Sequence, residues 1–389
     1  MKKRTLFLTA CFSFLLLLAL FPDKALLGAR AGLAAFFNNV LPALLPFYVG
    51  TTILVKSGAA KAATQYLACM MKPQFRLPGE ASFALFMAAI SGYPMGARLT
   101  NQLYQEGSLT KEESHRTAVL SSTCGPSFMV GVVAAGMLRS TTAGIVIAIA
   151  HYMAAIVTGI LARLLPQKEE KKKAPPAALP KELDGERALL SIFMDAVSQA
   201  ATALLGVGSF IIFFSALIAV LQHLGIIAFL AKGLAPLLSL LGLSPQLAGP
   251  LLEGAVEMTN GCQAVSNALV SMEQKVLGCT FLISFGGISI LCQSLHALRD
   301  TGIRPGYLCA MKLLQGILSL FFASMLLPFF SLSESVFSPT MQFTDVLGTH
   351  AALLLLGTVF LVIIGTFMAV YNLSGFYKQQ KKREVEQEK

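Results

Sequence analysis

Charged side chains are scarce in this chain of 389 residues, in which Asp, Glu, Lys and Arg together make up 13%. A soluble globular protein needs about a quarter of its residues charged to keep its surface in water. Hydrophobic residues, in contrast, reach 55% of the chain. The composition therefore excludes a string of soluble domains and predicts a protein embedded in a lipid bilayer.

The chain also lacks the motifs of catalysis and of metal binding. Its seven cysteines form no CxxC pair and lie in apolar or interfacial stretches, so we interpret them as small apolar residues. The sequence contains no Walker motif, no GxSxG, no HExxH and no His and Asp cluster beside a nucleophile. We therefore expect neither an enzyme nor a self-contained ATP-driven pump, and we expect no cofactor and no metal site.

Long apolar runs predict eight membrane-spanning helices, because a helix needs about 20 apolar residues to cross a bilayer. Two shorter apolar pieces, residues 81–90 and 247–256, run into glycine-containing breaks and are too short to cross alone, so we predict two re-entrant hairpins. The expected fold class is an all-α polytopic membrane protein. The predicted spans are residues 6–21, 41–55, 117–138, 144–165, 201–221, 276–295, 307–330 and 351–371.

Basic residues are distributed unequally between the loops. With this set of spans, 24 of the 30 Lys and Arg residues fall on one side of the membrane and 5 on the other, and Lys312 lies within a span. Cytoplasmic loops carry such an excess, so both termini are expected inside. The net charge of +10 then reflects membrane topology, and nucleic acid is not needed as a partner.

A charged linker at residues 166–186 divides the chain into two similar halves, residues 24–165 and 187–330. Each half has an amphipathic stretch, a span, an interfacial helix, a glycine-broken hairpin, a glycine-interrupted span and a closing span. Because the halves enter the membrane from opposite sides, they are predicted to be inverted repeats, the architecture of secondary transporters. The alternative is that the glycines are only close helix-packing points. The remaining predicted parts are a first span within residues 1–23, a last loop and span within 331–377, and a basic tail, 378–389.

The hairpins and interrupted spans supply the candidate substrate-binding residues. Exposed amides and half-helix N-termini suit anionic groups, whereas freed carbonyl groups suit cations. The candidates are Gly92, Tyr93, Pro94, Gly96, Arg98, Ser122, Thr123, Gly125, Ser127, Glu253, Glu257, Thr259, Asn260, Gly261, Gly286, Gly287 and Lys312.

Five ionisable side chains decide what such a site could bind. Glu253 and Glu257 are four residues apart, which predicts one helical face holding a proton or a cation; the alternative is a capping role. Lys312 lies at the position that matches His151 in the first half, and either could hold a carboxylate. The alternative for a lysine near the end of a span is to extend its side chain to the membrane interface. Arg98 could bind an anion bidentately or anchor the helix in the cytoplasm. Together these features predict a transporter of a small anionic solute.

Four segments carry a resemblance to a known family: residues 91–100, 105–110, 125–128 and 252–261. They resemble the nucleoside-recognition, or Gate, family of membrane proteins, and within it the branch of sporulation integral membrane proteins of the YlbJ type, or stage V sporulation protein V. The resemblance implies a protein of the cell membrane that moves dipicolinic acid from the mother cell across the outer forespore membrane. A transporter of nucleosides or another solute, a non-transporting sporulation scaffold, and a homo-oligomeric state remain open.

The inverted topology makes a prediction that cysteine labelling checks. In a background without the native cysteines, a cysteine at Lys172 should react with a membrane-impermeant maleimide only from the cytoplasmic side, and one at Lys232 only from the outside. Both residues on the same face would contradict the inverted repeat.

Overall fold

The computed structural model describes residues 2–56, 67–164, 186–330 and 332, and this part of the chain contains helices and no strand. The all-α fold class is therefore confirmed. Among the described residues, five helical segments are long and apolar enough to cross a membrane: Pro22–Leu54, Thr141–Ala162, Leu190–His223, Met272–Ala297 and Pro305–Phe329. The predicted span at 351–371, the linker residues 166–185 and the basic tail lie outside the described residues.

The first half begins with helices that run almost without interruption. Proline at the first position, Pro22, starts α2, where its missing N–H costs nothing. The predicted amphipathic stretch is not separated from the predicted span 41–55 but runs into it through a π-helical turn, because no residue between them breaks the helix. The elements are α1 (Lys2–Leu20), α2 (Pro22–Ala35), the π-helical turn η1 (Phe36–Val40) and α3 (Leu41–Lys56).

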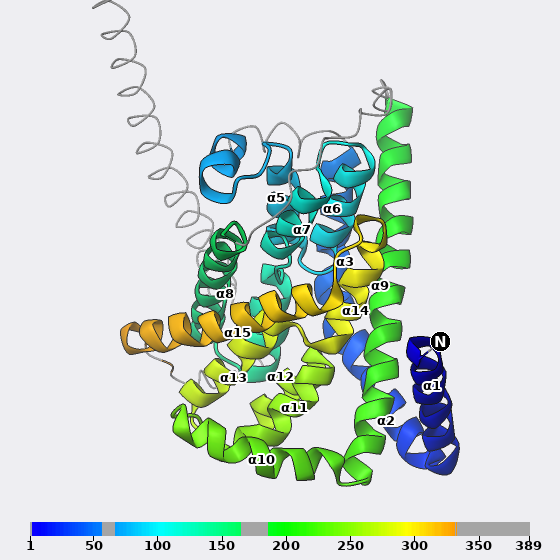
Figure 1. The fold of residues 1–389 in the computed structure, drawn as a ribbon, viewed down its shortest axis with the longest axis vertical. Helices are drawn as coiled ribbons and strands as arrows, with labels where there is room; N and C mark the ends of the chain where they lie inside the picture. The colour runs from blue at the N-terminus through cyan, green and yellow to red at the C-terminus, as the bar shows by residue number, and fades with distance from the viewer. Residues whose placement is uncertain (1, 57–66, 165–185, 331, 333–389) are drawn as a thin grey trace, which may run out of the picture. The chain divides into compact units, whose positions relative to one another are not determined.

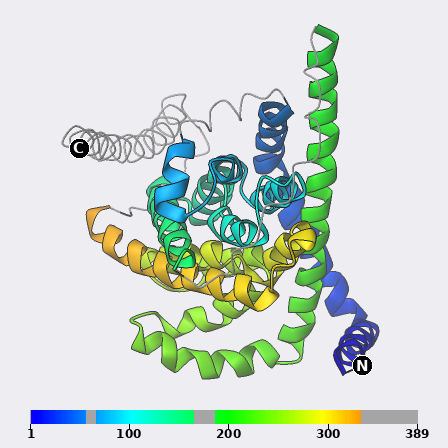
Figure 2. The same ribbon diagram turned by 45° about the horizontal axis from the view of Figure 1, so that its top comes forward.

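The same correction applies to the second half, where the amphipathic stretch and the span form one helix, α9 (Glu186–His223) of 38 residues. At 1.5 Å per residue it is about 57 Å long, more than the roughly 30 Å of a bilayer core. Figures 1 and 2 show it as one continuous helix with α1 and α2 beside one end. Gly28 and Gly32 of α2 let that helix approach Ser215 of α9 closely.

The rest of the first half forms a hairpin, a broken helix and a closing helix. The predicted span 117–138 is broken between Ser121 and Pro126, as the glycine there predicted. Thr110 and Glu113 form a capping box that starts the first piece of the broken helix. The elements are η2 (Met71–Phe75), α5 (Ala81–Ser91) and α6 (Met95–Gln105) of the hairpin, α7 (Lys111–Leu120) and η3 (Ser127–Leu138) of the broken helix, and the closing helix α8 (Thr141–Ala162).

The second half repeats this order of elements. A connecting helix, α10, leads to a second hairpin, a second broken helix and a second closing helix. The elements are α10 (Ile226–Leu240), η4 (Pro245–Leu247), α11 (Ala248–Val256) and α12 (Met258–Asn267) of the hairpin, α13 (Met272–Phe285) and α14 (Gly287–Ala297) of the broken helix, η5 (Arg299–Thr301), the closing helix α15 (Pro305–Leu326) and η6 (Leu327–Phe329).

The two closing helices join the halves, because α15 packs against α8 of the first half and against α13 of its own (Figure 1). One face of α15 is apolar and exposed at a spacing of four residues, as lipid contact requires: Leu313, Ile317, Phe321 and Met325. The opposite face carries buried polar side chains, Lys312, Gln315 and Ser319. That polar face is directed at the broken elements.

Candidate functional site

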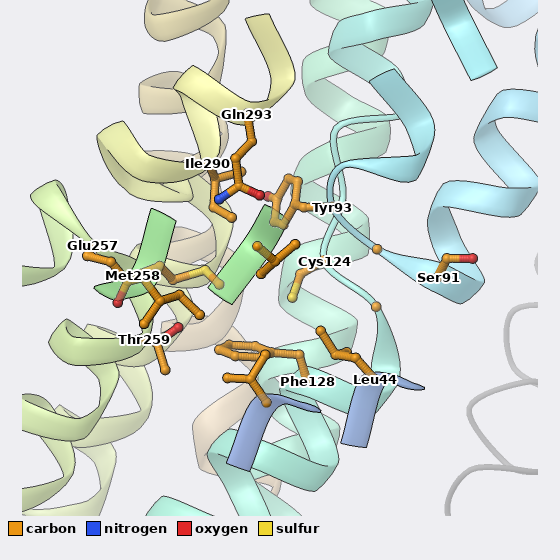
Figure 3. A pocket seen from close by; sticks show the side chains of 15 residues that line it. Leu44, Ser91, Tyr93, Cys124, Phe128, Glu257, Met258, Thr259, Ile290 and Gln293 are labelled. Carbon is orange, nitrogen blue, oxygen red and sulfur yellow. The ribbon is translucent and has the colours of Figure 1, made fainter. Parts of the chain in front are cut away.

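A narrow cavity lies where the hairpins and broken helices of both halves meet (Figure 3). Residues of α3 and α9 close it on one side. The space open to the centre of a water molecule in it is about 30 Å³, enough for one or two waters. It is lined by Val40, Leu44, Ser91, Gly92, Tyr93, Cys124, Gly125, Phe128, Val207, Ile211, Glu257, Met258, Thr259, Ile290 and Gln293. Five of the predicted site residues are therefore in its wall: Gly92, Tyr93, Gly125, Glu257 and Thr259.

Glycine lets the tip of the first hairpin touch the break in the next helix. Gly92 has a φ of +78°, and a Cβ there would overlap the amide of Gly125. A Cβ on Gly96 would overlap the carbonyl of Ser121. These contacts bear out the alternative, close packing, at both glycines, whereas a role of their backbone in substrate binding stays a prediction.

Lys312 is buried in the protein and does not snorkel to an interface, since its side chain is 1% exposed. Its Nζ donates hydrogen bonds to the Tyr93 hydroxyl at 2.7 Å, the Ser122 carbonyl at 2.8 Å and the Gln315 Oε1 at 2.7 Å. The Tyr93 hydroxyl in turn donates to the carbonyl of Ile283 at 3.1 Å, just before the second break. One lysine therefore connects the first hairpin, both broken helices and a closing helix.

His151, which matches Lys312 in the first half, reaches the same break from α8. The amide of Cys124 donates to its Nε2 at 2.9 Å, so Nε2 carries no proton. Its Nδ1 lies 2.8 Å from the hydroxyl of Ser284, to which it donates as the neutral tautomer. The sequence pattern pairs His151 with Lys312 and left open that it holds a carboxylate. In the structure His151 bonds to the break of its own half and, through Ser284, to the second half.

The second hairpin breaks at Glu257, which has an extended backbone and is 1% exposed. Its Oε2 accepts a hydrogen bond of 2.8 Å from the Asn260 amide, so it caps α12, and the side chain of Asn260 donates to Ser215 of α9. The Glu253 Oε1 accepts from Gln222 of α9 at 2.6 Å. The prediction that both carboxylates share one helical face is wrong, because α11 ends at Val256.

The glycines of the second half serve close packing. A Cβ on Gly261 would overlap the backbone of Gly254 in the opposite arm of the hairpin. Gly286 and Gly287 have φ values of +85° and +72°, which form the break between α13 and α14. A Cβ on Gly287 would come within 2.6 Å of the Gly254 carbonyl. The second hairpin and second break thus touch through glycine as the first pair does.

A second, larger cavity of about 360 Å³ lies beside the first, and Val207 and Gln293 line both. It lies between α6, α9 and α14 and contains three exposed basic side chains: Arg98, His296 and Arg299. Asp300, next to it, accepts hydrogen bonds from Asn101 and Gln105 and lies 3.9 Å from Arg299. Of the predicted site residues, Pro94 and Arg98 line this cavity.

Comparison with known proteins places these elements in a family. The Gate family, described as nucleoside recognition, matches residues 37–141 and 204–298, one segment in each half. The sporulation integral membrane protein YlbJ of Bacillus subtilis (strain 168) is 34% identical over 342 residues, 84% of this chain and 83% of the relative. The chain belongs to the Gate family. The resemblance that the sequence motifs suggested is confirmed.

Solved structures share the fold of this Gate-family protein. A variant of CNTnw in its intermediate 1 state superposes with a TM-score of 0.55 over 83% of this chain and 85% of that one, at 15% identity. A double variant of CNTnw in an outward-facing state gives 0.53 over 84% of each chain, at 15% identity. At this identity the likeness concerns the fold alone.

Several buried polar atoms near the cavities have no hydrogen-bond partner in the described part of this Gate-family protein. They include Thr123 Oγ1 and Ser127 Oγ at the first break, both predicted site residues, and Gln293 Oε1 between the two cavities. Figure 3 shows the Gln293 amide reaching from α14 towards Tyr93, whereas Ser91 points away. The sequence analysis missed Gln293, although a glutamine inside the apolar run 276–295 is itself a signal of a functional residue.

No group of three His, Cys, Asp or Glu side chains that could hold a metal gathers within the described residues.

The contact at Gly261 predicts a loss of stability on substitution. Gly261→Ala should destabilise the protein by about 1–3 kcal/mol, because the added methyl group overlaps the backbone of Gly254. Gly249→Ala, in the same hairpin but with open space around its Cβ position, is the matched control. The melting temperature in detergent should fall by several degrees for the first variant only. Equal melting temperatures would contradict the close packing of the two arms.

Proposed function

We propose that this Gate-family protein is a transporter of a small anionic solute, dipicolinic acid, rather than an enzyme. The proposal places it in the outer forespore membrane of sporulating cells, where it takes the solute from the mother cell. The observation that carries it is the narrow cavity, on which a hairpin and a broken helix from each half converge and beside which a basic cavity lies. The sporulation name of the relative from Bacillus subtilis supports the biological setting.

The two cavities form successive parts of one path. Gly92 and Tyr93, just before α6, and Ile290 of α14 line the narrow cavity, and residues further along both helices line the larger one. Gln293, with its unpartnered Oε1, is in the wall of both. A solute that leaves one cavity therefore meets polar groups of the same helices in the next.

Electrostatics favour an anion on this path. The N-termini of α6 and α14 have no side-chain cap, so no side chain offsets the partial positive charge of either helix end. The N-terminus of α12 is already capped by Glu257. Dipicolinic acid, a flat ring with two carboxylates, suits the uncapped termini together with Arg98, His296 and Arg299. A nucleoside, which the family description favours, carries no charge for those side chains to bind.

Transport requires a movement, because the narrow cavity holds no more than one or two waters. Apolar side chains of α3 and α9, Leu44, Val207 and Ile211, close it opposite the hairpins. Tyr48 of α3 donates across this seam to the carbonyl of Tyr93 at 2.7 Å. Two further side-chain hydrogen bonds join α9 to the second hairpin, those of Ser215 with Asn260 and of Gln222 with Glu253. The proposal therefore has α3 and α9 separating from the hairpins as the solute enters.

Uptake of labelled dipicolinate into proteoliposomes tests the proposal. Purified protein should accumulate dipicolinate, and Arg98→Gln should raise the KM about tenfold or more, a loss of roughly 1.4 kcal/mol of binding. Arg304→Gln is the matched control, since Arg304 is exposed but does not line the cavity. Uptake of nucleosides but not dipicolinate would favour the alternative solute. No uptake of either, with cavity variants that sporulate normally, would favour a scaffold.

Glu257 provides a separate test, because it is the one acidic side chain among the residues that line the narrow cavity. Glu257→Gln keeps an acceptor for the Asn260 amide but removes the charge. If that carboxylate serves transport by carrying a proton with the solute, dipicolinate uptake should fall at least tenfold, or about 1.4 kcal/mol. The melting temperature and membrane abundance should stay unchanged. Normal uptake would leave Glu257 with the capping role alone.

A further inference from the structure

We infer that the ammonium group of Lys312 is a built-in cation that fills the position where a transporter of this architecture would bind a coupling metal ion. Three oxygen atoms surround its Nζ at 2.7–2.8 Å, and they come from the first hairpin, the first break and α15. In secondary transporters, carbonyl groups freed by broken helices are the groups that coordinate Na⁺. Here such a carbonyl, that of Ser122, already accepts a hydrogen bond from Lys312 of the same chain.

The hydrogen-bond geometry favours the protonated form of the lysine. A neutral amine has two N–H donors, whereas an ammonium has three and no acceptor. The Tyr93 hydroxyl donates its own proton to the Ile283 carbonyl, so its oxygen accepts the hydrogen bond from Lys312. The Ser122 carbonyl and the Gln315 Oε1 are acceptors by nature. Three acceptors require three N–H groups and therefore the charged form.

The charge is balanced by dipoles and not by a carboxylate. Within the described residues, ion pairs join Lys56 to Asp195 and Arg299 to Asp300, and neither involves Lys312. Besides its three oxygens, the Nζ lies 4.9 Å from the centre of the Tyr93 ring, a cation–π contact. An unpaired cation held by neutral oxygens inside a membrane protein is the coordination expected of a bound monovalent metal ion.

Two consequences follow from this arrangement. The first hairpin is held to the break without any ion from solution, so the stability of the protein should not depend on Na⁺. The second consequence rests on the proposed function: transport of the solute should proceed equally well without Na⁺.

Melting temperatures of the purified protein in detergent test the first consequence without any substrate. We expect the native protein to melt at the same temperature, within 1 °C or so, in sodium chloride and in choline chloride. Lys312→Ala should melt roughly 5 °C or more lower, because three buried oxygens lose their donor. A clear rise of the native melting temperature with Na⁺ would overturn the inference, because it would show that a separate ion site holds the fold.

Chemical rescue of Lys312→Ala separates a cation site from mere packing. The substitution removes three carbons and the ammonium, which propylammonium replaces. Sodium chloride or propylammonium chloride should restore at least half of the lost melting temperature, whereas 1-propanol, of similar size but uncharged, should not. Restoration by 1-propanol, or by none of the three, would overturn the inference. Lys232→Ala, an exposed lysine of α10, is the control and should respond to none of them.

If Lys312→Ala does not fold, Tyr93→Phe still tests the inference. This variant removes one of the three oxygens and keeps the lysine. It should melt at a lower temperature than the native protein, and its melting temperature should stay insensitive to Na⁺, because the ammonium still fills the site. A melting temperature that depends on Na⁺ would contradict the inference.

Dipicolinate uptake in sodium and in choline buffers tests the second consequence, and Na⁺-dependent uptake would overturn it. Absence of uptake in both buffers would refute the proposed function, while the melting temperatures still decide the role of Lys312.

Discussion

Helix ends inside the membrane impose the constraint on which this structure depends. Each end leaves N–H or C=O groups without a partner, and an unpaired group away from water costs several kcal/mol. Side chains of the closing helices supply the missing hydrogen-bond partners at the first break, where Lys312 donates to the Ser122 carbonyl and His151 accepts from the Cys124 amide. Because these side chains come from α15 and α8, satisfying one break also fixes both closing helices and joins the two halves.

Local chemistry made much of the fold predictable. Apolar runs too short to cross the bilayer marked both hairpins, and glycines marked the breaks, because positions such as Gly92 and Gly286 have positive φ values that other residues adopt at a cost. The continuity of α9 was not predictable from the same rules, since an amphipathic stretch and an apolar run join into one helix wherever no breaker separates them. Its packing against α2 depends on tertiary contacts at Gly28 and Gly32.

The sequence predicted several residues that line the narrow cavity, but it did not predict the hydrogen bonds that connect them. Five of the predicted residues line the narrow cavity, yet Lys312 bonds to groups 190 and 219 residues away in the chain, a contact that no sequence spacing encodes. The pairing of Glu253 with Glu257 failed for the opposite reason. It relied on local helical spacing, and the chain leaves the helix at Glu257, so Glu253 finds its partner on α9 instead.

The halves repeat the same elements but place opposite charges at their hairpins. In the first, a cation, Lys312, bonds to the side chain of Tyr93 at the hairpin tip and leaves the N-terminus of α6 uncapped. In the second, an anion, Glu257, caps the N-terminus of α12. The partial positive charge of α6 therefore remains available, whereas that of α12 is neutralised by its own chain. For the proposed transport of an anion, this asymmetry favours the first hairpin and α14 as the place where the anion binds, on the side where Arg98 and His296 line the larger cavity.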